Sequence, residues 1–85
     1  MVATDQELIT RFIEPHPRKR GAGEAQLADS KIAVWALIGY CRMVDGDLDR
    51  VAADYDLPRE AVDAALAYYR VHKAEIDARL AANGG

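Results

Sequence analysis

The sequence predicts a mainly helical protein: a small helix-turn-helix domain of three to four helices with a short β-strand or hairpin at its N-terminus. Apolar residues recur at helical spacing after residue 33, Asp, Gly and Pro divide residues 45–58, and a β-branched segment ends at two prolines. The 85 residues suffice for one domain, because independent domains usually hold about 100 residues or more. We therefore expect a single domain over residues 1–85, with a β element and basic turn in residues 1–33 and helices in residues 34–83.

The N-terminal β element is predicted from residues 8–14, which are rich in β-branched and aromatic side chains. Pro15 and Pro17 follow this segment. Because proline cannot donate a ladder hydrogen bond, we expect an edge strand that stops there. A flexible basic turn comes next, and residues 25–33 offer a second short strand around Ile32.

The first predicted helix begins at Val34. Its inward stripe has the spacing i, i+3, i+4 and i+7 and consists of Val34, Leu37, Ile38 and Cys41. Trp35 lies off this stripe, so it either packs against the N-terminal strands or faces a partner. Cys41 is the single cysteine and cannot form an internal disulfide, so we expect a small buried hydrophobic side chain.

A helix-turn-helix is predicted over residues 48–66. Asp47 is placed to cap its first helix, and Pro58 suits the first turn of its second helix. The inner faces are supplied by Leu48, Val51, Ala52, Tyr55, Leu57, Val62 and Leu66. Beyond Pro58 the apolar stripe continues to Leu80, which fits either one helix of about 25 residues or two helices joined near His72.

Positive charge gathers in the N-terminal half. Residues 1–44 hold six lysines and arginines against five acids, whereas residues 45–85 hold five against nine. Electrostatics therefore assigns any nucleic-acid contact mainly to the N-terminal part. The second helix of the helix-turn-helix would present Arg59, Glu60, Asp63, Ala64 and Ala67 to a DNA groove, and only the arginine suits a phosphate or a guanine edge. The predicted nucleic-acid-binding residues are Arg11, Arg18, Lys19, Arg20 and Arg59.

Metal, cofactor and catalytic sites are not predicted. The alternate aspartates of residues 45–49 have the spacing of a calcium loop, but Arg50 stands where that loop needs glycine. Two histidines and one cysteine do not supply a zinc site or an oriented nucleophile. The longest apolar stretch, residues 32–41, is far below the roughly 20 residues of a membrane helix. With an acidic N-terminus in place of a secretory signal, we expect a non-enzymatic cytoplasmic protein without a membrane contact.

Aromatic side chains supply candidates for a partner interface, because Trp and Tyr are preferred anchors. Tyr68 and Tyr69 are neighbours and point about 100° apart on a helix, so one of them is expected to be available to a partner. Trp35, Tyr40 and Tyr68 are the candidates, and coverage of the small core is an equally good interpretation of each. A homodimer is expected, since so short a chain buries only about 60–65% of its unfolded surface.

Three stretches resemble the antitoxin-like family named domain of unknown function 433. They are residues 31–40 (KIAVWALIGY), residues 45–69 (DGDLDRVAADYDLPREAVDAALAYY) and residues 72–80 (HKAEIDARL). The likeness covers roughly residues 9–82, and it is strongest to the members common in high-GC actinobacteria. One departure is that residues 29–33 read DSKIA where many members have Gly-Thr-Arg-Ile-Pro, so a role of that turn in DNA contact is not carried over.

The resemblance implies a VapB-type antitoxin of a type II toxin–antitoxin pair. Its partners would be a PIN-like nuclease toxin and operator DNA, and its C-terminal helix would contact the toxin through Tyr68, His72, Glu75 and Arg79. We therefore expect a non-catalytic antitoxin that masks the nuclease and contributes to repression of its own operon. Two alternatives stay open: a stand-alone DNA-binding regulator without a toxin, and a homodimeric interaction adaptor built through the first strand.

Overall fold

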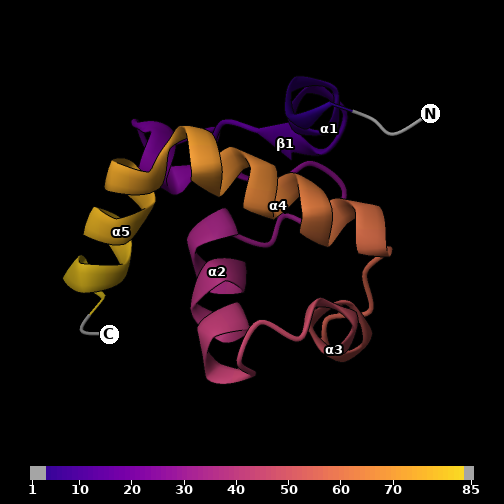
Figure 1. Cartoon of the computed structure of the whole chain (residues 1–85). Coiled ribbons are helices and arrows are strands. Elements are labelled where there is room, and N and C mark those ends of the chain that lie inside the picture. Colours follow the sequence, from indigo (N-terminus) through magenta and orange to yellow (C-terminus); the bar gives the residue numbers. More distant parts are fainter. Residues whose placement is uncertain (1–3, 84–85) are drawn as a thin grey trace.

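The computed structural model describes residues 4–83 and contains, within this range, five α-helices, one 3₁₀ turn and a two-stranded antiparallel sheet (Figure 1). In chain order the elements are α1 (Asp5–Phe12), β1 (Ile13–Glu14), η1 (Ala22–Glu24), β2 (Gln26–Leu27), α2 (Val34–Met43), α3 (Leu48–Asp54), α4 (Arg59–Val71) and α5 (Lys73–Ala82). The predicted fold class, mainly helical with a short N-terminal hairpin, is confirmed, although the helices outnumber the three to four expected.

The N-terminal segment is a helix where an edge strand was predicted over residues 8–14. The Thr4 hydroxyl oxygen accepts the Glu7 N–H at 3.1 Å and the Glu7 carboxylate accepts the Thr4 N–H at 3.3 Å, which is a capping box. Helical spacing then turns Ile9 and Phe12 toward the core. The strand prediction was wrong because these caps and this burial outweigh β-propensity, and extended structure remains only in β1.

The hairpin forms between β1 and β2, with Ile13 opposite Leu27 and Glu14 opposite Gln26. The second strand was predicted within residues 25–33 and centred on Ile32. It forms at Gln26–Leu27, about five residues earlier. The Ile32 carbonyl accepts the N–H of Leu27 at 2.8 Å, so this part of the chain folds back on β2 as a turn. The pairing holds the start of the basic loop, residues 15–21, against the helical body.

The predicted inner face of α2 is confirmed, because its buried residues are Val34, Leu37, Ile38 and Cys41. After α2 the chain turns through Gly46, whose φ of 78° lies in the left-handed region that favours glycine. The Asp47 carboxylate then accepts the N–H of Arg50 at 3.1 Å and starts α3, as predicted for this cap. The start of the helix-turn-helix formed by α3 and α4 thus follows from local sequence signals.

The segment after Pro58 forms two helices, which decides between the two alternatives. His72 lies at the joint with φ −119° and ψ 40°, outside helical values, and its N–H closes α4 on the Tyr68 carbonyl at 2.9 Å. Figure 1 shows α5 turning away from the axis of α4 and running beside α2. The buried side chains of α5 are Ile76 and Leu80.

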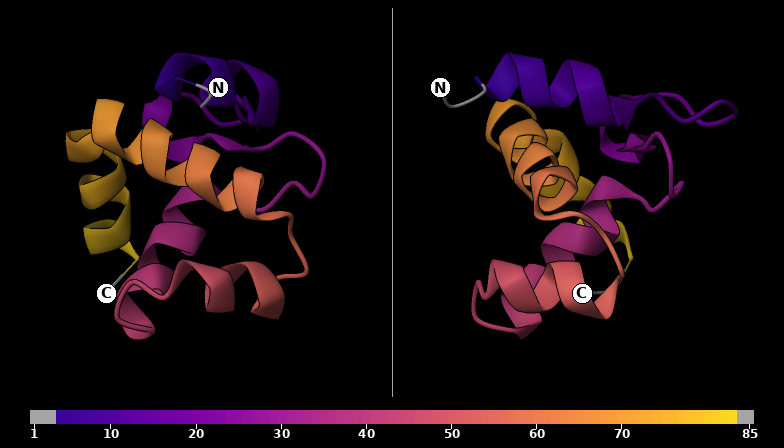
Figure 2. Two further views of the ribbon diagram at one scale, coloured as in Figure 1. Left: turned by 45° about the vertical axis from the view of Figure 1, so that its right-hand side comes forward. Right: turned by 90° about the vertical axis from the view of Figure 1, so that its right-hand side faces the viewer.

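The central helix of the fold is α4. It is contacted by α1 on one side and by α2, α3 and α5 on others (Figure 2). Arg11 near the end of α1 pairs with Glu60 near the start of α4, and Asp5 pairs with Arg70 near the end of α4, so these helices run antiparallel. The buried residues of α4 are Ala61, Val62, Ala64, Ala65, Ala67 and Tyr68. Four alanines among them let neighbouring elements approach α4 closely.

Candidate functional site

Two of the five α4 residues predicted to face a DNA groove are buried, whereas Arg59, Glu60 and Asp63 reach the surface. Ala64 and Ala67 are completely buried, because α1 packs on this side of the helix. Arg59 donates to Asp49 at 2.6 Å and to Asp63 at 3.1 Å, and these bonds raise its pKa further. The positive charge of Arg59 is therefore neutralised by the neighbouring carboxylates of Asp49 and Asp63.

The basic loop carries the strongest local positive charge. Arg18, Lys19 and Arg20 are exposed, and no ion pair formed within residues 4–83 involves any of them. Arg11, the remaining predicted nucleic-acid contact, is exposed on α1 but lies 3.5 Å from Glu60. The right-hand view of Figure 2 shows the loop projecting from the helical body, opposite the end that carries α3. Of the five predicted cations, three share one unpaired surface.

An aromatic groove lies between α2 and α5. Its lining residues are Trp35, Ala36, Gly39, Tyr40, Arg42, Met43, Tyr55, Leu80 and Asn83. The rings of Tyr40 and Tyr55 lie 5.3 Å apart, and the Tyr40 hydroxyl donates to Asp54, which raises the pKa of this tyrosine. The groove brings together Trp35 and Tyr40, two of the predicted partner contacts, with Met43, which is 79% exposed. Sequence reasoning missed Met43, although its position outside the inner stripe of α2 is a usable signal.

The other predicted partner contacts, Tyr68, His72, Glu75 and Arg79, do not share one free surface. Tyr68 is 8% exposed, its hydroxyl donates to the Ala22 carbonyl at 2.8 Å, and its ring lies 4.5 Å from that of His72. His72 in turn lies 3.4 Å from the Glu75 carboxylate on the first turn of α5. In this chain by itself these side chains mainly hold η1 and the joint of α4 with α5.

Arg79 connects three elements. Its guanidinium donates to Glu24 at 2.8 Å and lies 4.3 Å from the centre of the Trp35 ring, a cation–π arrangement. Nearby, a Cβ on Gly23 would stand 2.8 Å from the Glu75 carbonyl oxygen, so η1 packs directly on α5. Arg79 of α5, itself bound to Glu24 of η1, thus holds in position the tryptophan that lines the groove.

Asp77 joins α5 to the rest of the fold. Its carboxylate accepts hydrogen bonds from Lys73 at 2.8 Å, from the Tyr69 hydroxyl at 2.7 Å and from Arg42 at 2.9 Å. These donors, Lys73 first, lower the pKa of Asp77 from 3.8 to about 2. The network fixes one wall of the aromatic groove.

The lowered pKa of Asp77 predicts a pH dependence of stability. In the unfolded chain the carboxyl takes up its proton near 3.8, and in the folded chain only near 2. The stabilisation is therefore complete above 3.8 and is lost as the pH falls toward about 2. We expect Asp77→Asn to lower the thermal midpoint above this window and to flatten its pH dependence within it, as measured by circular dichroism. Asp29→Asn removes a carboxylate from an exposed turn and serves as the control; equal pH profiles for both variants would contradict the assignment.

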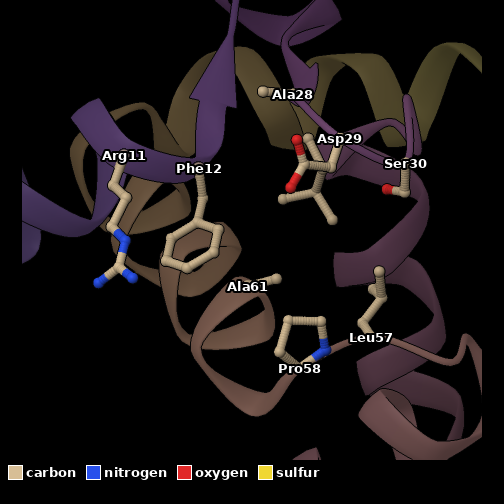
Figure 3. Close-up of a pocket in the computed structure, with 9 residues that line it drawn as sticks. Arg11, Phe12, Ala28, Asp29, Ser30, Leu57, Pro58 and Ala61 are labelled. Carbon is tan, nitrogen blue, oxygen red and sulfur yellow. The ribbon is translucent and has the colours of Figure 1, made fainter.

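Figure 3 shows a second hollow, between the turn after β2 and the start of α4. Phe12, Leu57 and Pro58 are among its apolar walls, and Asp29 and Ser30 lie at one side. Its volume is about 40 Å³, whereas small-molecule sites usually hold about 300–1,000 Å³. Within residues 4–83 no cluster of three or more His, Cys, Asp or Glu side chains is placed to hold a metal ion. No helix in the described part of the chain is both long and apolar enough to cross a membrane.

The fold and its two surfaces define a small helical domain of the helix-turn-helix type with an added N-terminal helix. The chain belongs to the family described as Protein of unknown function (DUF433), which matches residues 13–69. The match includes the basic loop, α2, α3 and most of α4, and it leaves α1 and α5 outside. No curated protein and no solved structure matches the chain.

Proposed function

We propose that this protein is a non-catalytic, cytoplasmic antitoxin of the VapB type that binds and masks a PIN-like nuclease toxin. The observation that carries the proposal is the aromatic groove, where Trp35, Tyr40 and Tyr55 meet the exposed side chain of Met43. Such residues anchor protein interfaces because they bury much apolar area. Membership of the family adds support through the resemblance to VapB-type antitoxins described above.

The groove is suited to protein binding because much of its geometry exists before a partner arrives. Arg79 holds the Trp35 ring, and Asp54 holds the hydroxyl of Tyr40. Side chains that are already ordered lose less conformational entropy on association. Met43 is free to adapt to the partner, as methionine does at variable interfaces.

Operator binding is the second part of the proposal, and we assign it to the basic loop in place of α4. The covered face of α4 and the paired state of Arg59 argue against groove reading by that helix. Arg18, Lys19 and Arg20 suit backbone phosphates, which supply most of the affinity of nonspecific DNA binding. A homodimer would present two such loops to one duplex.

Met43→Glu tests the antitoxin proposal. We expect this variant to bind the nuclease encoded by the adjacent gene at least about tenfold more weakly, because a charge would enter the apolar groove. Its thermal midpoint should stay near that of the parent, since Met43 is 79% exposed. Binding is measured by co-purification and by titration calorimetry, and masking by relief of RNA cleavage.

Val71→Glu is the matched control, because Val71 is also exposed, at 60%, but does not line the groove. Parent-like binding by Met43→Glu would exclude the groove as the toxin contact. An adjacent gene of unrelated type, together with a pull-down from the host that returns no nuclease, would reject the antitoxin proposal itself.

The basic loop also favours a second candidate, a DNA-binding regulator without a toxin. This candidate requires the isolated chain to bind operator DNA while no nuclease binds the groove. The homodimeric adaptor, in contrast, would give no DNA complex at low salt, and sedimentation at high concentration would reject it by finding a monomer.

A further inference from the structure

The basic loop is organised by an imidazole. The Nδ1 atom of His16 accepts hydrogen bonds from the backbone N–H groups of Arg18 and Lys19, at 3.0 Å each. An acceptor needs a lone pair, so Nδ1 carries no proton in this arrangement and the neutral ring carries its proton on Nε2. The loop conformation therefore depends on the protonation state of one side chain.

Two successive N–H groups that converge on one point form an anion-binding concavity. Here the imidazole nitrogen occupies the point where an oxygen of an anion would lie. Arg18, Lys19 and Arg20, which form no ion pair with any residue of 4–83, follow along the loop, and Gly21 ends it with a φ of 103°. The chemistry of such a site suits a phosphate group, which offers several acceptor oxygens to N–H donors and cationic side chains.

The surroundings of His16 favour the exchange of imidazole for phosphate once the ring is protonated. The polar groups that line the two hollows beside it are Glu14 from β1, Gln26 from β2, Lys31 from the turn after β2, Tyr68 from α4, and Arg18, Lys19 and Arg20 of the loop itself. Glu14 is the single carboxylate among these and already accepts from Gln26 at 2.6 Å and from Lys31 at 2.9 Å. The tyrosine is occupied by the Ala22 carbonyl. A protonated ring would thus stand mainly among cations.

We propose that residues 16–20 form a phosphate-binding site that neutral His16 closes and protonated His16 opens. Protonation removes the acceptor on Nδ1, frees the N–H groups of Arg18 and Lys19, and adds a positive charge to the loop. The ligand is the backbone phosphate of a nucleic acid, so the inference deepens the operator contact proposed above and rests on it. Duplex binding is then stronger when the ring of His16 is protonated than when it is neutral.

The experiment compares the full chain with His16→Asn and His16→Ala. An asparagine oxygen can accept the N–H two residues later, as in an Asx turn, but the amide takes up no proton on acidification. Alanine leaves the two N–H groups open at every pH. Binding of a short mixed-sequence duplex is measured by fluorescence anisotropy at low salt across a pH series. In parallel, NMR follows the ring of His16 and the amide protons of Arg18 and Lys19.

For the parent we expect an affinity gain of about three- to tenfold on acidification and a salt slope that steepens by about one ion. The amide resonances should move together with those of the ring. Both variants should show flat pH profiles, with His16→Asn resembling the parent that carries a neutral ring. Inorganic phosphate separates the two sources of the ligand group: it should perturb the same amides but bind far more weakly than the duplex.

Three results would overturn the inference. They are an unchanged pH dependence in His16→Asn, amide resonances that do not follow the ring, and the absence of duplex binding at every pH. Inorganic phosphate that binds as tightly as the duplex would remove the nucleic acid as the ligand. Because the Met43→Glu experiment measures toxin binding at another surface, failure of the phosphate site and failure of the antitoxin proposal are distinguishable.

Discussion

Replacing Arg18, Lys19 and Arg20 together by alanine is expected to weaken duplex DNA binding about a hundredfold at low salt and to reduce the salt slope by about three. Each side chain contacts one phosphate in the proposed complex and releases about one counterion. None of the three is held by an ion pair within the described residues, so their loss should leave the thermal midpoint close to the parent value. Fluorescence anisotropy across a salt series measures both quantities.

Arg59→Ala is the informative control for the triple variant. Arg59 was predicted as a base or phosphate contact, but Asp49 and Asp63 hold its guanidinium. We expect this substitution to change duplex affinity by less than about twofold. A loss comparable to that of the loop variant would mean that α4 reads DNA, and our assignment of operator contact to the loop would be wrong.

Ile76→Ala is expected to lower the free energy of unfolding by about 3 kcal/mol and the thermal midpoint by about 15 °C. Ile76 is completely buried and is the more deeply buried of the two side chains that fix α5 to the core, so its truncation leaves a cavity there. The same change should disorder the Arg79 contact with Trp35 and weaken nuclease binding at the groove. Thermal and urea unfolding followed by circular dichroism measure the first effect.

Val71→Ala supplies the comparison for Ile76→Ala, because it also shortens an aliphatic side chain but at a position that is 60% exposed. Its effect should stay within about 0.5 kcal/mol. If both variants unfold at the same temperature as the parent, α5 does not pack on the core as described here.

The position of α1 bears directly on function. It lies outside the residues that match the family and covers the side of α4 that a groove-reading helix would need to expose. The antiparallel pairing is held at both ends, by Asp5 with Arg70 and by Arg11 with Glu60. In the function proposed here the helix-turn-helix therefore supports the fold, and the basic loop and the aromatic groove make the contacts with DNA and toxin.

Part of the candidate site could be predicted from the sequence. Arg18, Lys19 and Arg20 are adjacent in the chain, so their common surface needs no tertiary information. Trp35 and Tyr40 were selected by residue type, and the fold places both along one groove. Tyr68 was selected by the same argument but is buried, because the direction in which adjacent tyrosines point depends on what surrounds α4. The Arg59–Asp63 pair has helical i, i+4 spacing and could be read from the sequence, whereas the pair with Asp49 depends on the packing of α3 against α4.

The sequence by itself determined the features that depend on near neighbours: the stripe of α2, the Asp47 cap and the left-handed turn at Gly46. It also contained the capping box at Thr4, a local helix signal, but the β-propensity of the following residues led to the wrong prediction of a strand. Only the tertiary structure decided that α1 covers α4 and that α5 turns back to form one side of the aromatic groove. The physical reason is that these outcomes depend on contacts between residues far apart in the chain, such as Asp5 with Arg70, which are 65 positions apart. Local sequence patterns do not reveal such contacts.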